Sequence, residues 1–312
     1  MKGFKIVATG RCLPEAVVTN DDMANIVETS DEWIVSRTGI RTRRFCKEES
    51  VADLAAKAAK AALDKAGVTP DQLCACVVAT VSPECLAPTM GCMVQGALGL
   101  PENIPCFDIN VGCTGFIYGL QVVRGLLLQS EKPYALLIGA EALSRITDFT
   151  DRSTCVLFGD GAGAVVVKLD DSPYECVLGA RCDRDAILIE GPGSETKPVI
   201  HMDGQPVFRF AVEAVPDCIN ELLERAGLTL SDIDWFVPHQ ANQRIINFAA
   251  KRLKVPKEKF YQNMERYGNT SAASIPIALD EMAEQGLLKP GQKIICVGFG
   301  AGLTWGGALL EW

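Results

Sequence analysis

The chain has 312 residues, of which 48% are hydrophobic and 22% charged, and its formal net charge at pH 7 is −9. These values are typical of a globular protein with a sizeable core, built as one large domain or as two of about 150 residues. The acidic balance argues against general attraction to nucleic acid or to an anionic membrane surface.

The cysteine and histidine counts narrow the chemistry. There are 13 cysteines, an odd number, without a CxxC pair or regular spacing. We interpret them as reduced thiols of a cytoplasmic protein, and expect neither a disulfide framework nor a zinc site. The N-terminal MKGFKIVATG lacks the apolar region of a signal peptide, and the uncharged runs 85–101 and 294–310 are interrupted by Gly or Pro. Only His201 and His239 are available to a mechanism that needs histidine.

The first elements of the chain surround an arginine-rich segment. FKIVAT at 4–9 predicts a strand, and SDEWIVSRTGIRTRR at 30–44 follows. In it, Trp33 precedes four arginines, which suits stacking of a nucleotide base and binding of its phosphates. A solvated basic turn with one half-buried tryptophan is the structural alternative. Residues 51–66 predict a helix ended by Gly67, 73–81 a buried strand, and 82–91 a loop.

Cys113 lies where the periodicity of the chain changes. Alternating apolar residues at 107–111 indicate a strand, and Gly112 permits a sharp turn. From there Phe116, Leu120, Val123 and Leu127 follow helical spacing. The spacing therefore places Cys113 at the first residues of a buried helix, whose free N–H groups and positive dipole end favour a thiolate. The alternative is a small buried hydrophobic residue, the usual state of a free cysteine.

The second half of the sequence repeats the first. KAALDKAGVTPDQLCACVVAT at 60–80 aligns without a gap on NELLERAGLTLSDIDWFVPHQ at 220–240, and GCT at 112–114 corresponds to GNT at 268–270. YALLIG then matches KIICVG, and GAGAVVV at 161–167 resembles WGGALLE at 305–311. This order indicates an internal duplication with its junction near residue 170, and predicts two similar α/β layers packed together.

The duplication has a chemical consequence. It places Cys113 and Asn269 at equivalent turns, each opening a helix, and His239 at the end of a strand equivalent to 73–79. Equivalent loops of pseudo-twofold halves meet near the axis, so we expect Cys113, His239 and Asn269 to converge on one site. Taken singly, His239 could be a structural turn residue and Asn269 a helix cap.

Other motif assignments fit less well. GDGAG at 159–163 and GFGAG at 298–302 resemble the start of a dinucleotide fingerprint, but apolar strand-like runs follow both where a helix is required. Val111 occupies the position at which a hydrolase nucleophile elbow needs glycine. The order Cys, His, Asn is also that of papain-like proteases, yet their local cysteine signature is absent.

Three motifs together, DINVGCTGF, PHQAN and YGNTSAAS, resemble β-ketoacyl-acyl-carrier-protein synthase III of type II fatty-acid synthesis. The segment at 30–44 and the C-terminal GFGAGLTWG support this resemblance, which covers essentially the whole chain. It implies an α/β, internally duplicated, thiolase-like fold with five αβαβα layers, as a homodimer. The predicted halves are 1–170, which carries the cysteine nucleophile, and 171–312, which carries the histidine and asparagine.

The resemblance also implies roles for individual residues. Cys113 would accept the acyl group from acyl-CoA, while His239 and Asn269 would serve decarboxylative condensation with malonyl-acyl-carrier protein. Backbone N–H groups of Cys113 and Ala301 would hold the oxyanion. Metal or redox cofactors are not expected. Residues matching the coenzyme A tunnel are Thr29, Trp33, Arg37, Arg152, Phe208, Asn242 and Arg244, with Trp33 and Arg152 sandwiching the adenine.

The carrier-protein docking region corresponds to Gln240, Ala241, Asn242, Gln243 and Arg244, extended to Lys251 and Arg252. Charge agrees with that assignment. The segment 240–259 contains one acidic residue, Glu258, and six basic ones: Arg244, Lys251, Arg252, Lys254, Lys257 and Lys259. A locally basic face on an acidic protein suits an acidic partner. An ordinary solvated helix is the alternative.

Two departures from the family leave the primer open. A residue of the 82–91 loop closes the acyl pocket of the partner subunit in the family, and Ala87 aligns where acetyl-preferring members often have Phe. We therefore expect longer or branched primers to be possible. Asn110-Val111-Gly112 also replaces an Ala-rich approach to the cysteine. Rival functions are a starter ketosynthase for polyketide or quinolone synthesis, a cysteine thioesterase, and a non-catalytic acyl-CoA-binding homologue.

Overall fold

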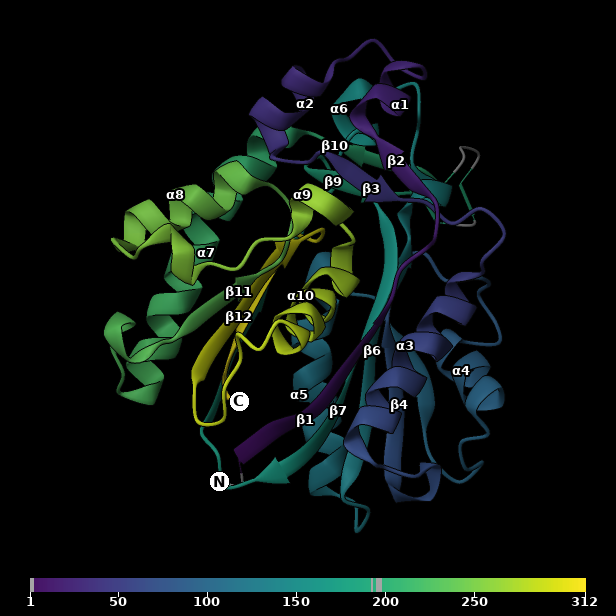
Figure 1. Cartoon of the computed structure of the whole chain (residues 1–312), viewed down its shortest axis with the longest axis vertical. Coiled ribbons are helices and arrows are strands. Elements are labelled where there is room, and N and C mark those ends of the chain that lie inside the picture. The colour runs from purple at the N-terminus through teal and green to yellow at the C-terminus, as the bar shows by residue number, and fades with distance from the viewer. Residues whose placement is uncertain (1–2, 192, 195–197) are drawn as a thin grey trace.

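Two β-sheets organise the chain in the computed structural model, which describes residues 3–191, 193–194 and 198–312 (Figure 1). The first sheet has the strand order β1-β7-β6-β4-β5. The second has the order β8-β13-β12-β11. Their bounds are β1 (Gly3–Cys12), β4 (Leu73–Ala79), β5 (Cys106–Ile109), β6 (Tyr134–Ala142), β7 (Asp160–Asp170), β8 (Tyr174–Ala180), β11 (Trp235–Pro238), β12 (Lys293–Gly300) and β13 (Thr304–Glu311).

The two sheets are built in the same way. β4 pairs with β6 in parallel, and β6 with β7 and β7 with β1 pair antiparallel. In the second sheet, β11 and β12 are parallel, and β12 with β13 and β13 with β8 are antiparallel. A parallel bridge between Phe236 and Phe260 takes the place of the β4–β5 pairing. The duplicated order of elements expected from the sequence is therefore present, while the division at residue 170 stays a prediction.

Helices cover both faces of each sheet and give five layers. α3 (Val51–Ala66) and α4 (Met90–Leu98) pack on the outer face of the first sheet, and α7 (Gly204–Ala226) and α8 (Gln243–Leu253) on that of the second. α5 (Gly115–Leu128) and α10 (Ser274–Glu284) lie between the sheets, where they share one apolar core (Figure 1). The expected αβαβα arrangement is confirmed.

Smaller elements cap the end of the molecule at which the site lies. They include the ribbons β2 (Val17–Thr19) with β3 (Thr42–Arg44) and β9 (Ile187–Ile189) with β10 (Ile200–Met202), and the short helices α1 (Asn20–Ala24), α2 (Asp31–Thr38), α6 (Arg152–Cys155) and α9 (Met264–Tyr267). Single 3₁₀ turns are η1 (Pro70–Gln72), η2 (Gly112–Thr114), η3 (Leu143–Ile146), η4 (Leu230–Asp232), η5 (Lys257–Lys259) and η6 (Ser271–Ala273).

Local sequence signals explain the regular elements. α3 begins at a capping box in which the side chains of Ser50 and Asp53 bond each other's backbone, and it ends at Gly67 in the left-handed conformation. The prediction for 51–66 is therefore confirmed. The strand expected from alternation at 107–111 is shorter, since β5 ends at Ile109, and the predicted strand at 73–81 ends at Ala79.

Buried polar contacts join the central helix α10 to the first half of the chain. Asp280, 1% exposed, accepts hydrogen bonds from Thr9 Oγ1 at 2.8 Å, Arg11 Nη1 at 2.6 Å and Lys65 Nζ at 2.7 Å. Such charge-assisted bonds fix the register of packed elements as well as adding energy. They hold the two halves in the relation on which the site depends. No helix among the described residues is long and apolar enough to cross a membrane.

Candidate active site

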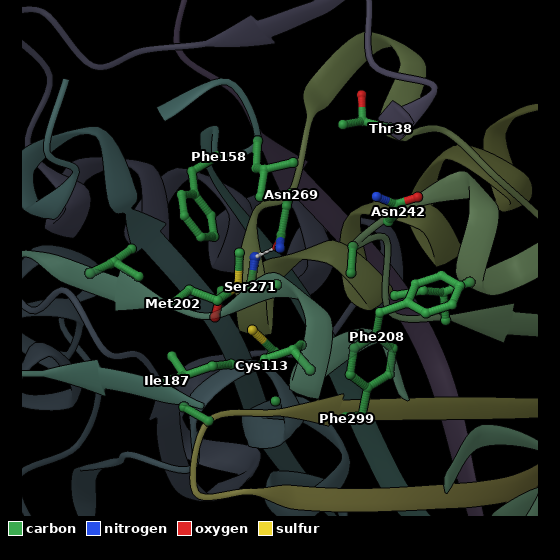
Figure 2. A pocket seen from close by; sticks show the side chains of 18 of the residues that line it. Thr38, Cys113, Phe158, Ile187, Met202, Phe208, Asn242, Asn269, Ser271 and Phe299 are labelled. Atoms are coloured by element: carbon green, nitrogen blue, oxygen red, sulfur yellow. Dashed lines mark hydrogen bonds between the residues drawn. The ribbon is translucent and has the colours of Figure 1, made fainter. Parts of the chain in front are cut away.

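One cavity of about 580 Å³ is lined by all three residues expected to converge, of which Figure 2 labels Cys113 and Asn269. Cys113 comes from η2, His239 follows the end of β11, and Asn269 precedes η6. A Cβ placed on Gly298 would lie 3.8 Å from both the Cys113 carbonyl oxygen and His239 Cβ, so the first two residues are neighbours. Asn269 is tied to the first half because its N–H donates to Leu157 O at 2.8 Å and its carbonyl accepts from Gly159 N at 2.9 Å.

Close backbone approach positions Cys113. Gly112 has φ +53°, a left-handed conformation that favours glycine, and a Cβ on it would lie 3.2 Å from Ala301 Cβ and 3.3 Å from Ala301 N. A Cβ on Gly300 would lie 2.8 Å from both Cys113 N and Cys113 Cβ. The β12–β13 turn therefore lies directly against the cysteine, which brings Ala301 N beside it.

Burial opposes ionisation of the thiol. Desolvation raises the pKa of Cys113 to about 12, the Ser271 hydroxyl works in the opposite direction, and charge repulsion from Glu141 adds to the rise. Cys113 lies in η2, the 3₁₀ turn that runs directly into α5 at Gly115, close to the first residues of the helix as expected. The raised pKa favours the thiol at rest, whereas the nearby helix start favours the thiolate.

His239 is buried, and its ring is hydrogen-bonded to a serine. Burial lowers its pKa to about 3, and the residue is 1% exposed. Its Nδ1 lies 2.7 Å from Ser274 Oγ, which also accepts from Gln240 N at 3.3 Å. If the Ser274 hydroxyl donates its proton to Nδ1, the neutral imidazole carries its own hydrogen on Nε2.

Asn269 is oriented by its own turn. Its Oδ1 accepts from the backbone N–H of Ser271 at 2.9 Å, the bond drawn in Figure 2. A backbone N–H can only donate, so the amide oxygen must face Ser271 and Nδ2 is left to donate elsewhere. Asn269 is 7% exposed and lines the cavity. Together with His239, it provides two neutral donors in a largely dry site.

The cavity extends from this centre toward the arginine-rich segment. The guanidinium groups of Arg37 and Arg152 lie 4.7 and 4.8 Å from the Trp33 ring centroid, and Arg152 Nη1 donates to Glu28 O at 3.0 Å. A flat base can enter between Trp33 and Arg152 only after Arg152 moves away from the ring. Thr29 Oγ1 is buried without a hydrogen-bond partner, and neither Thr29 nor Arg152 is among the residues that line the cavity.

The other residues of the expected tunnel line the same cavity. Arg244 lies over the ring of Phe208 at 5.6 Å. Asn242 caps α8, accepting from Arg244 N at 2.8 Å and donating to Arg37 O at 3.0 Å. The polar groups of Asn242 are thus already used within the protein. Farther in, the wall is apolar and includes Val81, Leu143, Phe158, Ile187, Ile189 and Ile200.

Comparison with known proteins identifies the family. Family models described as 3-oxoacyl-[acyl-carrier-protein] synthase III and its C-terminal region match residues 107–186 and 223–312. β-Ketoacyl-[acyl-carrier-protein] synthases III of Clostridium beijerinckii and Clostridium novyi are each 47% identical over the whole of both chains. The chain belongs to the 3-oxoacyl-[acyl-carrier-protein] synthase III family. It is therefore an acyl-transferring condensing enzyme, as expected.

Solved structures agree with this assignment. The synthase III of Aquifex aeolicus has a TM-score of 0.94 and 43% identity, covering 99% of this chain and all of that one. That of Pseudomonas aeruginosa has a TM-score of 0.94 at 39% identity, covering 100% of this chain and 98% of that one. A priming β-ketosynthase of the R1128 polyketide pathway follows at 0.93 and 34%, covering 99% and 96%. The expected thiolase-like fold is confirmed.

The assignment of Gln240 to carrier-protein docking is wrong. Gln240 is 1% exposed, its Nε2 donates to Pro238 O and Tyr261 O, and its Oε1 accepts from Asn263 N. A buried, fully bonded amide cannot meet a partner protein, so Gln240 holds the loop after β11 in place. Gln243, Arg244, Lys251 and Arg252 are exposed on α8, and Ala241 and Asn242 are half-buried. Arg252 is also bound to Asp217 at 3.0 Å.

Ala87 lies outside the cavity of its own chain. It is exposed in the 82–91 loop, beside Leu86, which is 74% exposed. Three further residues with a role in the site were missed by sequence reasoning. Ser271 and Ser274 belong to the YGNTSAAS motif, in which only Asn269 was singled out. The sequence signal for Glu141 is that it is the single acidic residue within the apolar run YALLIGAEAL.

Proposed function

We propose that this synthase III family member starts fatty-acid assembly by two successive reactions at Cys113. In the first, Cys113 Sγ attacks the thioester carbonyl of an acyl-CoA. The developing oxyanion is held by the backbone N–H groups of Cys113 and Ala301, which the Gly112 and Gly300 contacts bring together. Coenzyme A leaves as its thiolate, and the acyl group stays on Cys113.

In the second reaction, malonyl-acyl-carrier protein enters the same cavity. His239 Nε2 and Asn269 Nδ2 donate to its thioester carbonyl, on which enolate charge builds as CO₂ departs. Neutral donors held in place by Ser274 and Ser271 need no reorganisation as that charge develops. The carbanion attacks acyl-Cys113 and releases 3-ketoacyl-carrier protein. Each step is a substitution, a decarboxylation or a proton transfer, so the sequence requires no redox cofactor.

The observation that carries this proposal is the shared cavity with its two oriented donors. A cysteine beside one neutral donor would also suit a hydrolase. Two donors fixed by separate hydrogen bonds, Ser274 to His239 and Ser271 to Asn269, suit a reaction in which a second thioester must be stabilised as its enolate. A thioesterase needs no such second site, which disfavours that rival.

The primer and the subunit arrangement are part of the proposal. β5 forms the edge of the first sheet, with a described neighbour on one side only, and such an edge is a natural place for another chain to pair. We propose a homodimer through β5, in which Ala87 of each subunit borders the apolar end of the partner's cavity. A methyl group there leaves room for primers longer than acetyl.

The surface of α8 indicates the partner protein. α8 presents Arg244 and Lys251 around Phe248, which is 42% exposed. An exposed aromatic ring among bases suits an acidic carrier protein with an apolar contact at its centre.

The 13 cysteines are free thiols, which supports a reducing compartment, and we propose the cytoplasm.

Mass spectrometry tests the proposal directly. The enzyme is incubated with a panel of straight and branched acyl-CoAs, then with malonyl-acyl-carrier protein. We expect acylation of Cys113 followed by 3-ketoacyl-carrier protein and CO₂. Cys113→Ser should lose condensation, because the serine hydroxyl is a much weaker nucleophile. Free acid without a new carbon–carbon bond would instead identify a thioesterase, and an unmodified Cys113 would contradict catalysis altogether.

A second candidate function is priming of a polyketide pathway. The 34% identity and the TM-score of 0.93 to the R1128 priming ketosynthase support this second candidate. Parallel assays with carrier proteins of fatty-acid and polyketide type separate the two. A kcat/KM at least tenfold higher with the fatty-acid carrier protein supports the first function, and the reverse ratio the second.

A further inference from the structure

A fully buried arginine beside the cavity wall hydrogen-bonds neutral groups. Arg43, on β3, is 0% exposed, and its guanidinium donates to Asn20 Oδ1 at 2.8 Å and to the backbone oxygen of Val156 at 2.7 Å. Its Nε is buried without a hydrogen-bond partner. Burial lowers the pKa of Arg43 to about 10, so the side chain keeps its charge at neutral pH. A buried charge bonded to neutral groups is costly to fold, so the segments that Arg43 joins gain their connection at the expense of stability.

The Asn20 side chain extends this connection to both ends of α2. Its Nδ2 donates to Asp31 Oδ1, at the first residue of that helix, and to Ile40 O, just beyond its last turn, both at 2.8 Å. Asn20 is itself 1% exposed. The bond from Arg43 fixes the orientation of the Asn20 amide, because only its oxygen can accept from a guanidinium. One buried side chain therefore holds the start and the end of α2.

On its other side, Arg43 reaches the end of α6. Val156 is the C-cap residue of that helix, whose first residue is Arg152. Trp33 lies on α2, and the Arg152 guanidinium is 4.8 Å from the centre of its ring. The two faces expected to enclose the coenzyme A base thus come from α2 and α6, and the bonds from Asn20 through Arg43 join these two helices. Figure 1 shows α1, α2, α6 and β3 grouped at one end of the molecule.

We propose that Arg43 is a positioning residue for the nucleotide of acyl-CoA. It fixes the distance between the backbones of α2 and α6, and so keeps Trp33 and Arg152 at a spacing that one base can enter. The Arg152 side chain lies against the Trp33 ring, and its Nη1 donates to Glu28 O at 3.0 Å. Entry of a base requires only this side chain to move, because the helices that carry both faces are held by Arg43. The inference rests on the proposed function, since it concerns how acyl-CoA is bound.

The variant must remove the guanidinium bonds and keep the rest of the packing. The Cβ of Arg43 lies against the turn that leads to Asn269: a Cβ placed on Gly268 would be 3.3 Å from it, and one placed on Gly159 would be 3.2 Å from it. Arg43→Met retains this Cβ and an unbranched side chain of similar length. It should therefore leave the turn before Asn269 in place, and separate only α2 from α6.

Thioesters with and without the nucleotide test this role. Steady-state kinetics compares the acyl-CoA that the wild type uses best with the matching acyl-pantetheine, which ends before the nucleotide. In Arg43→Met we expect the KM for acyl-CoA to rise at least about tenfold, an amount that stacking of one base can contribute to affinity. kcat with acyl-CoA and kcat/KM with acyl-pantetheine should stay within about threefold of the wild-type values. Calorimetry should show the Kd of free coenzyme A rising by the same factor as the KM.

A merely structural role predicts a different pattern. If Arg43 only stabilised the fold, Arg43→Met would lose activity with both thioesters in equal proportion, or would keep the wild-type KM for acyl-CoA. Either result would overturn the inference. Arg43→Lys should raise the KM less than Arg43→Met does, because one ammonium group can donate to both Asn20 Oδ1 and Val156 O.

A second variant keeps the test decisive if Arg43→Met does not fold. Asn20→Asp gives the guanidinium a carboxylate to pair with, and removes the NH₂ group that holds α2 at Asp31 and Ile40. It should produce the same selective rise in the KM for acyl-CoA, and a wild-type KM would overturn the inference. Arg44→Met, at the next position of β3, is the matched control, because its guanidinium bonds a loop outside both helices.

The proposed function and this inference fail in different ways. If acyl-CoA leaves Cys113 of the wild type unmodified and coenzyme A does not bind, the proposed function is wrong and the inference falls with it. If the wild type is acylated and binds coenzyme A, and the Arg43 and Asn20 variants match it in both respects, the inference alone is wrong.

Discussion

Asn269→Asp separates the chemistry of Asn269 from its part in the fold. The substitution keeps an oxygen to accept from Ser271 N, at 2.9 Å in the wild type, and replaces only the NH₂ group that faces the cavity. Asn269→Ala would additionally leave the buried Ser271 N–H without its acceptor, at a cost of about 1–3 kcal/mol in stability. The aspartate variant should therefore fold like the wild type and lack one donor to the enolate oxygen.

The expected loss follows from the role of that donor. Removing one preorganised donor to a developing oxyanion lowers kcat by roughly 10²–10³, or about 2.7–4 kcal/mol. Decarboxylation of malonyl-carrier protein, measured as released ¹⁴CO₂, should fall by that factor. Acylation of Cys113 by radiolabelled acyl-CoA should change by less than about tenfold, because the oxyanion of that step is assigned to backbone N–H groups.

Two results would refute this reasoning. Decarboxylation within about threefold of the wild-type rate would show that Asn269 Nδ2 does not face the enolate. Equal loss of acylation and decarboxylation would show that the two steps are not divided between separate donors. Asn220→Asp, on the exposed face of α7 and away from the proposed carrier-protein contact, is the matched control for the added charge.

Three further predictions concern binding, pH and stability. Trp33→Ala should raise the KM for acyl-CoA at least about tenfold and leave the KM for malonyl-carrier protein within twofold, by steady-state kinetics, because Trp33 is proposed to contact only the nucleotide of coenzyme A. Folding lowers the pKa of His239 from 6.5 to about 3, so this residue destabilises the folded protein as the pH falls below 6.5. Folding raises the pKa of Glu141 from 4.5 to about 7, so this residue destabilises the folded protein as the pH rises above 4.5. Between pH 5 and 6.5, thermal denaturation should therefore show Glu141→Gln gaining stability with rising pH and His239→Asn losing it, and parallel slopes would contradict both assignments. Asp280→Ala should lower the free energy of unfolding by about 2–3 kcal/mol in urea titrations, because it breaks charge-assisted bonds to Arg11 and Lys65; a change below about 0.5 kcal/mol would show that these bonds contribute little.

Much of the architecture is encoded in local sequence patterns. Helix α3 follows from alanine periodicity, a Ser50 cap and Gly67, all of which act within a few residues of one another. The repeated order of elements made the two-sheet arrangement predictable, because similar halves bury similar faces. That repeat also brought Cys113 and Asn269 to equivalent turns. With only two histidines in the chain, His239 was then the natural third member.

The chemical state of the site was decided by contacts between distant segments. Helix position alone suggested a Cys113 thiolate, but burial beside the β12–β13 turn and repulsion from Glu141 raise the pKa of the thiol. Likewise, Gln240 opens the segment that resembles the docking region, yet its side chain is buried and bonded to Tyr261 and Asn263. Desolvation and hydrogen bonding depend on which groups surround an atom, and those groups come from residues far away in the chain. The sequence by itself therefore determined which residues meet, while the tertiary structure decided which protons they carry and where their donors point.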